Sequence, residues 1–292
     1  MRQRSTSTAK PSRPPRGPVT AFVLAGGASL GAMQAGMVQA LYERGILPDL
    51  LVGTSAGGLN AAFLASRPAT VETAHALADV WRRLRREHVF PLNARVVLGG
   101  LANHRDHFVP ATGVRRLIER HLEIGDLREA AIPLHLVAYD VRSGEEVRLS
   151  DGDAAEAVLA AAAIPGVLPP VRRGERVLVD GGLVNNTPIS HAVELGAERI
   201  FVLPTGTAAR AGTAGHRGAL EAAVHAFTLL VGARLEGDLQ RYADAAELVV
   251  LPAANRHRVQ PTDFGHASRL IGEALSDARD VLAATSALPA AA

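Results

Sequence analysis

The stretch Leu50-Leu51-Val52-Gly53-Thr54-Ser55-Ala56-Gly57-Gly58 decides how this 292-residue chain is interpreted. An apolar run over 47–52 predicts a buried strand, and the small residues from Ala56 onward are typical of a helix. Between them, G-x-S-x-G is the pattern of a sharp strand-to-helix turn that exposes a serine hydroxyl above a sheet edge. We therefore predict that Ser55 is a nucleophile and that Gly53 and Gly57 allow the tight turn. A serine that only caps the helix is the alternative.

A second glycine-rich loop precedes the first one. An apolar run over 20–25 predicts a strand, which leads through Gly26-Gly27-Ala28-Ser29-Leu30-Gly31 into a helix expected over 32–44. The glycine spacing does not fit a dinucleotide-binding loop. One right-handed β-α-β crossover would bring the two loops to the same sheet edge. We expect the N–H groups of Gly26, Gly27 and Ala28 to form an oxyanion hole for Ser55, with Gly31 completing the loop. A purely structural glycine turn is the alternative.

The third informative stretch is Arg176-Val177-Leu178-Val179-Asp180-Gly181-Gly182-Leu183-Val184-Asn185-Asn186-Thr187-Pro188. Its apolar run predicts a strand that carries Asp180 at its carboxyl end, and Gly181 and Gly182 leave space beside that carboxylate. Ligands of open α/β sheets bind at this edge. Asp180 is therefore a candidate for a role beside Ser55, and an ordinary Asp-Gly-Gly turn is the alternative.

The remaining elements alternate between strand and helix patterns. Strands are expected over 134–139, 146–149, 199–203 and 247–251, and helices over 71–86, 113–122, 154–163, 187–195, 220–242 and 265–284. This order predicts an α/β fold, a three-layer α/β/α sandwich around a mostly parallel sheet. We expect residues 1–17 to form a basic disordered tail. Residues 18–285 should form a single domain, and residues 286–292 should be a frayed end.

Composition excludes several classes of protein. The net charge of +2 gives no overall case for nucleic-acid binding, and the lack of cysteine excludes disulfides and thiolate metal sites. No apolar run is long enough for a transmembrane helix. The basic tail resembles the start of a signal peptide, but the glycines of the following run argue against export. We expect a cytoplasmic protein, with no metal at His104 and His107 because no carboxylates support them.

The predicted helix 71–86 is basic on one side. Trp81 lies on its apolar stripe, with Arg82, Arg83, Arg85 and Arg86 around it. Such a helix could contact an anionic lipid surface at the periphery of a membrane. We favour the simpler interpretation, in which it covers the core and its basic face is solvated. The sequence does not give the oligomeric state.

Taken together and in this order, the three motifs resemble those of the patatin-like phospholipase family, in particular its bacterial members. The segments Ala162-Ala163-Ile164-Pro165-Gly166 and Pro261-Thr262-Asp263-Phe264 are also similar to parts of bacterial members. The resemblance extends from Val19 to about Ala284. It implies a Ser–Asp dyad, with Ser55 as nucleophile and Asp180 as its base, that hydrolyses lipid acyl esters through an acyl-enzyme without a metal or another cofactor.

This chain departs from the family in its glycine loop, which commonly reads G-G-G-x-R-G. Ala28 replaces the third glycine and Leu30 replaces the arginine. Alanine still donates its N–H, so an oxyanion hole made of N–H groups tolerates this change. Loss of the arginine removes a cation near the oxyanion or the lipid headgroup, which affects rate and substrate preference more than mechanism.

Three other functions remain open. An α/β-hydrolase with a Ser-Asp-His triad could use His191 or His266, although that fold usually has several strands before its elbow. A catalytically silent lipid-binding protein could keep the same fold. Transfer of the acyl group to an acceptor other than water could replace hydrolysis.

Overall fold

The computed structural model describes residues 17–91, 107–206, 231, 233–253, 255–257 and 259–286. Its strands are β1 (Thr20–Leu24), β2 (Leu50–Thr54), β3 (Leu134–Asp140), β4 (Glu145–Leu149), β5 (Val171–Arg173), β6 (Arg176–Asp180), β7 (Arg199–Leu203) and β8 (Glu247–Val250). Its α-helices are α1 (Ala32–Glu43), α2 (Ala56–Ala65), α3 (Val71–Arg83), α4 (Arg86–Val89), α6 (Thr112–His121), α7 (Ala154–Ala161), α8 (Gly182–Asn185), α9 (Ile189–Glu194) and α11 (Ala267–Ser286). Two 3-10 turns, η1 (Ala28–Gly31) and η2 (Leu127–Glu129), complete the described elements.

The strands form one sheet in the order β5-β6-β3-β2-β1-β7-β8, and β4 pairs with β3 beside this path. Strands β3, β2, β1, β7 and β8 are parallel, as predicted for the centre of the sheet. Leu24 is in register with both Gly53 and Leu203, so β1, β2 and β7 end at one common edge. The glycine loop after β1 and the turn after β2 therefore leave the sheet side by side.

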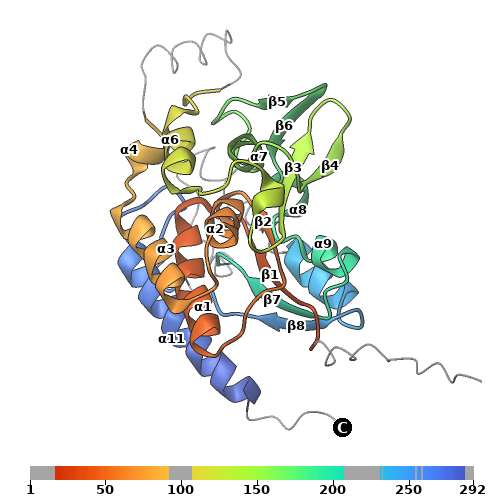
Figure 1. Ribbon diagram of the computed structural model, residues 1–292. Coiled ribbons are helices and arrows are strands. Elements are labelled where there is room, and N and C mark those ends of the chain that lie inside the picture. Colours follow the sequence, from red (N-terminus) through yellow and green to blue (C-terminus); the bar gives the residue numbers. More distant parts are fainter. Residues whose placement is uncertain are drawn as a thin grey trace, which may run out of the picture.

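Both faces of the sheet are buried, which confirms the three-layer prediction. Phe22 and Leu24 of β1 pack into the core beneath α1, α2, α3 and α11, whereas Ala21 and Val23 pack into the core on the other face beneath α9. This alternation follows from the period of two in a strand. Figure 1 shows α1, α3 and α11 on one side of the sheet and α9 on the other. In the described part of the chain, no helix is both long and apolar enough to cross a bilayer.

Strand β6 reaches this edge of the sheet in a direction that we did not predict. It is antiparallel to β3, with Ala138 opposite Asp180, whereas β2 pairs with the earlier part of β3 as far as Thr54 opposite Val137. Strand β3 extends beyond the end of β2, and β6 returns along that extension. Asp180 therefore takes the place beside β3 that β2 leaves free when the chain turns at Ser55.

Several predicted boundaries shift for local reasons. Strand β2 begins at Leu50 rather than at 47, because Pro48 lacks an N–H and the Asp49 carboxylate accepts the Thr20 N–H at 2.8 Å. It also continues through Gly53 instead of breaking there. The basic helix predicted over 71–86 ends at Arg83, because Leu84 is extended, and α4 follows as a separate turn.

Parts of our prediction fall outside the described residues. They are His104, nearly all of the tail 1–17, nearly all of the end 286–292, and most of the helix predicted over 220–242, of which 233–241 are described and helical. That 18–285 form a single domain stays a prediction.

Helices α1 and α11 are in contact across a glycine. A Cβ on Gly36 would overlap the Ile271 carbonyl and lie 2.9 Å from the Leu275 nitrogen. We therefore expect Gly36→Ala to lower the free energy of unfolding by about 1–3 kcal/mol, measured by urea unfolding. Gly272→Ala on α11 is the matched control. A Cβ there meets no atom within 4 Å, so this substitution should stabilise by about 0.5–1 kcal/mol. Equal effects of the two substitutions would contradict this packing.

Candidate active site

Ser55 lies in a strained turn between β2 and α2. Its backbone has φ 55° and ψ −127°, a left-handed φ that a residue with a Cβ adopts at a cost of about 1–2 kcal/mol. The turn is tight: a Cβ on Gly57 would overlap the Leu24 carbonyl, and one on Gly53 would lie 2.6 Å from the Gly57 carbonyl oxygen. Gly53 and Gly57 are thus required for the reason that the sequence indicated. The strain presents the Ser55 hydroxyl at the sheet edge.

Asp180 is buried beside Ser55. The Ser55 side chain interacts with the Asp180 carboxylate, and the Gly182 N–H donates to the same carboxylate at 2.8 Å. Burial raises the pKa of Asp180 to about 6, although the Ser55 side chain and the Gly182 N–H oppose the rise. The carboxylate is therefore a stronger base than an exposed aspartate and is still ionised at pH 7.

The end of α7 holds the backbones of both residues. Ala161 is the last residue of α7, and its carbonyl accepts the Ser55 N–H at 3.0 Å. Two residues later, the Ala163 carbonyl accepts the Asp180 N–H at 2.9 Å. Carbonyls at a helix C-terminus have no partner within the helix, so they are available for this purpose. The Ala162–Gly166 segment that resembles bacterial family members thus lies directly behind the serine and the aspartate.

The glycine loop leaves two of its N–H groups without an acceptor among the described residues. The Gly26 N–H, which we predicted to be a third donor, donates to the Asn186 carbonyl at 3.1 Å and is occupied in this structure. Among the described residues, no acceptor is bound by the N–H of Gly27 or of Ala28. Ala28 has φ 48°, so the residue that replaces the family's third glycine keeps a glycine-like backbone. Leu30, in place of the arginine, is buried.

Two side chains that we did not single out hold the Gly26 peptide. The Gly26 carbonyl accepts hydrogen bonds from the Thr205 hydroxyl at 2.5 Å and from the Asn186 amide at 3.2 Å. A Cβ on Gly27 would also overlap Thr205. Asn186 belongs to the Asp-Gly-Gly motif, so the segment that follows β6 and Asp180 also supports the glycine loop. The sequence signal was the second asparagine of that motif, to which we assigned no role.

A buried polar network supports the loop from beneath. Gln34 donates to the carbonyls of Ala25 at 2.8 Å and Leu203 at 2.9 Å. Asn60 donates to the Gly31 carbonyl at 2.9 Å and to the Gln34 amide oxygen at 2.8 Å, and it accepts the Trp81 N–H at 2.9 Å. Both amide side chains are fully paired, and such a network is rigid when satisfied. Trp81, predicted on an apolar stripe, is buried, and its N–H joins this network.

An apolar cavity adjoins Ser55. Among the described residues, its lining is apolar except for Ser55, Asn60 and His121. Burial, followed by the charges of Arg120 and Arg67, lowers the pKa of His121, which keeps it neutral at pH 7. The apolar wall comes mainly from α2, α3, α4, α6 and α7: Leu59, Ala62, Phe63, Leu77, Val80, Trp81, Leu84, Val89, Phe90, Val114, Leu117, Ile118, Leu122, Val158, Ala162, Ile164, Leu168 and Phe264. A hydrocarbon chain fits this chemistry.

The histidines that would complete a Ser-Asp-His triad lie with other partners. His191 is 2.6 Å from Glu146 and 3.2 Å from Glu194. His266 is 3.2 Å from Asp263. The structure thus brings Ser55 together with Asp180, Gly26 and Ala28, but it shows no contact of either histidine with that group. The backbone of His107 forms an isolated parallel β-bridge with Gly166.

The strain at Ala28 can be measured. Because a glycine adopts positive φ without steric cost, we expect Ala28→Gly to raise the free energy of unfolding by about 0.5–1 kcal/mol. Ala25→Gly is the control, since Ala25 lies three residues earlier, is buried and has no positive φ. It should destabilise the protein, because it adds freedom to the unfolded chain and removes a buried methyl group. Thermal unfolding of the two variants separates these outcomes, and a loss of stability in both would contradict the strained geometry.

Known proteins are similar to this chain to different extents. A family model described as Patatin-like phospholipase matches residues 22–193. An uncharacterised NTE family protein of Mycobacterium tuberculosis is 30% identical over 173 residues, 57% of this chain and 27% of that protein. Lysophospholipase NTE1 of Mycosarcoma maydis is 29% identical over 195 residues, 64% of this chain and 10% of that protein.

Among solved structures, VipD from Legionella pneumophila superposes with a TM-score of 0.47 at 14% identity, covering 91% of this chain and 66% of that one. The chain spans about a quarter or less of the length of the curated relatives cited above. The family match, in contrast, covers more than half of this chain and runs from β1 into α9. This protein therefore belongs to the patatin-like phospholipase family.

Proposed function

We propose that the protein is a lipid acyl hydrolase that cleaves carboxylic esters with Ser55 and Asp180. The observation that carries this proposal is the Ser55 side chain beside the buried Asp180 carboxylate and an apolar cavity. A serine hydroxyl attacks an ester only when a base accepts its proton. Asp180, with its pKa raised to about 6, is suited to accept it directly.

In the proposed reaction, the acyl chain occupies the apolar cavity and the ester carbonyl lies above Ser55. Asp180 accepts the hydroxyl proton as the serine oxygen attacks the carbonyl carbon. The N–H groups of Gly27 and Ala28 stabilise the tetrahedral oxyanion, each contributing about 3 kcal/mol. The intermediate then expels the alcohol, which takes the proton from Asp180, and leaves an acyl-enzyme on Ser55. Water, deprotonated by Asp180, releases the fatty acid.

Lipids are the proposed substrates because the cavity is apolar and because the family, with a lysophospholipase among the relatives, acts on such esters. The alternatives keep the same fold and cavity. A silent lipid-binding protein would not need an aligned serine and carboxylate, whereas an acyltransferase would use both and differ only in the acceptor.

The proposal is tested by hydrolysis of short-chain and long-chain esters and of phospholipids by the purified protein. We expect Ser55→Ala and Asp180→Asn each to lower kcat/KM by roughly 10³-fold or more, since each removes a member of the reacting pair. His191→Gln and His266→Gln are matched controls that remove an imidazole outside the site. They should retain activity with their folding intact by circular dichroism.

Loss of activity in a histidine variant would restore the triad mechanism. A folded parent protein that turns over none of these esters would favour the lipid-binding alternative. Consumption of ester without release of fatty acid, with the acyl group recovered on an added alcohol, would indicate transfer.

A further inference from the structure

Helix α6 has two chemically different faces. Val114, Leu117 and Ile118 line the apolar cavity. The exposed residues are Thr112, Arg115, Arg116, Glu119 and Arg120. Their spacing places them on one stripe of the helix, opposite the cavity. Helix α6 is therefore a wall between the acyl cavity and an arginine-rich outer surface.

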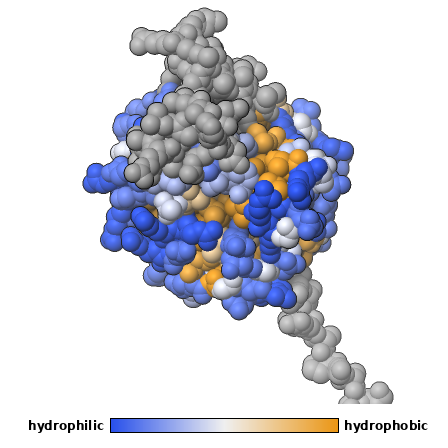
Figure 2. Space-filling model, turned by 90° about the horizontal axis from the view of Figure 1, so that it is seen from above, coloured by the Kyte–Doolittle hydropathy of each residue, from blue (hydrophilic) through white to orange (hydrophobic). Residues whose placement is uncertain are grey.

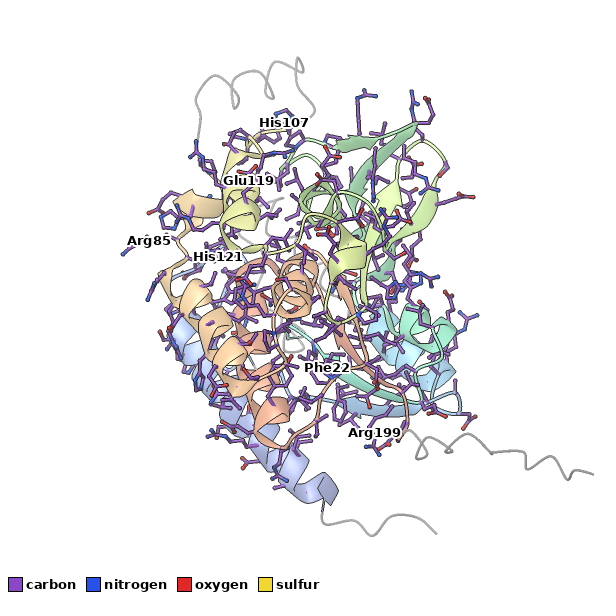
Figure 3. The ribbon with its side chains drawn as sticks, viewed as in Figure 1. Phe22, Arg85, His107, Glu119, His121 and Arg199 are labelled. Atoms are coloured by element: carbon purple, nitrogen blue, oxygen red, sulfur yellow. The ribbon has the colours of Figure 1, made fainter. Side chains whose placement is uncertain are left out.

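Helix α4 continues this wall. Val89 lines the cavity, whereas Arg85, which precedes the helix, and Arg86 are exposed. Figure 3 shows Arg85 at the outer edge of the molecule. The two helices are in direct contact, because a Cβ on Gly113 of α6 would lie 2.5 Å from the His88 carbonyl oxygen of α4. We call the exposed residues Arg85, Arg86, Arg115, Arg116 and Arg120 the α4–α6 arginine surface.

This surface carries an uncompensated charge. On α4 and α6, together with Arg85 before α4, the exposed side chains that are charged at pH 7 are these five arginines and two glutamates, Glu87 and Glu119. In the described part of the chain, none of the five forms an ion pair with an acidic side chain. Arg82 of α3, by comparison, is paired with Asp79 at 2.8 Å. The local excess of three positive charges exceeds the net charge of +2 of the whole chain.

An exposed apolar side chain lies close to this charge in the chain. Phe108, four residues before α6, has 42% of its surface exposed, and its N–H donates to the Gly166 carbonyl at 3.0 Å. Figure 2 looks down on the molecule from above and shows apolar areas among hydrophilic residues where the face is not covered by grey atoms. Arginines beside exposed apolar side chains are typical of surfaces that lie in the headgroup region of a bilayer.

We propose that the α4–α6 arginine surface docks the protein on an anionic lipid bilayer. This proposal rests on the proposed function, because it places the wall of the acyl cavity against the phase that holds acyl chains. Guanidinium groups bind lipid phosphates in a bidentate manner and attract anionic headgroups. A purely polyanionic partner, such as nucleic acid or an acidic protein, would make no use of the cavity behind these helices. The surface differs from the one that the sequence suggested, since Trp81 is buried and Arg82 is paired.

The test separates docking from catalysis by using the full chain with Ser55→Ala, which should not hydrolyse lipid. We expect it to co-sediment with phosphatidylcholine vesicles that contain about 30 mol% phosphatidylglycerol, and not with vesicles of phosphatidylcholine alone. Raising the salt to about 0.5 M should release it. The variant Arg86→Gln, Arg116→Gln and Arg120→Gln should lower the vesicle partition coefficient by about 10- to 100-fold.

The matched control removes the same charge elsewhere. Arg199→Gln, Arg241→Gln and Arg279→Gln lie away from α4 and α6, and Figure 3 places Arg199 far from Arg85. This variant should bind anionic vesicles nearly as well as the parent. In the catalytically intact protein, the α4–α6 triple variant should lose activity on anionic vesicles and keep its activity on a soluble short-chain ester.

Equal losses in the two triple variants would overturn the proposal in favour of nonspecific charge. Equal binding to both kinds of vesicle would overturn it in favour of apolar insertion. Absence of vesicle binding, together with binding to DNA or heparin, would overturn it in favour of a polyanion partner. Specific vesicle binding by a protein that hydrolyses no ester would uphold docking and refute the proposed function.

Discussion

The Asp180 carboxylate is kept out of water beside the Ser55 hydroxyl, and the fold around β2, β3, β6 and α7 holds it there. Burial raises its pKa from 3.8 to about 6, which corresponds to about 3 kcal/mol against the ionised form in the folded chain. The folded chain therefore binds this proton more tightly than the unfolded chain. Stability contributed by Asp180 is present at about pH 4 and falls as the pH rises to about 6. The large apolar core offsets this cost, and the same burial makes the carboxylate a useful base.

The loop opposite Asp180 depends on a second set of buried polar groups. Gly26 is held by Asn186 and Thr205, while Gln34 and Asn60 bind the carbonyls that flank the loop. Trp81 joins this network by its N–H, and its ring lines the acyl cavity in parallel with Phe264 at 6.5 Å. The wall that would contact an acyl chain is thereby connected, through two side chains, to the N–H groups that would contact its carbonyl oxygen. Under the proposed function, acyl binding and chemistry therefore share one support.

The sequence predicted what local patterns determine and missed what long-range contacts determine. The alternation of apolar runs and the G-x-S-x-G turn led to the three-layer fold and to the position of Ser55, because a strand with both faces buried and a strained elbow have their own residue patterns. The antiparallel direction of β6 was missed, since an apolar strand carries no signal of its orientation. The occupied N–H of Gly26, the Gln34–Asn60–Trp81 network and the break at Leu84 were missed because each depends on partners far away in the chain or on one backbone dihedral.

The rate at which a fluorophosphonate modifies Ser55, measured from about pH 4.5 to about pH 8, tests the central claim most directly, because the reaction needs the serine, its base and the oxyanion donors but no lipid substrate. If Asp180 is the base, the rate rises with pH, has its midpoint near the pKa of about 6 and is level above it. In Asp180→Asn the rate is lower by roughly 10²-fold or more and the midpoint is absent. A rate that does not change with pH in the parent protein, or an equally fast reaction in Asp180→Asn, would contradict the account.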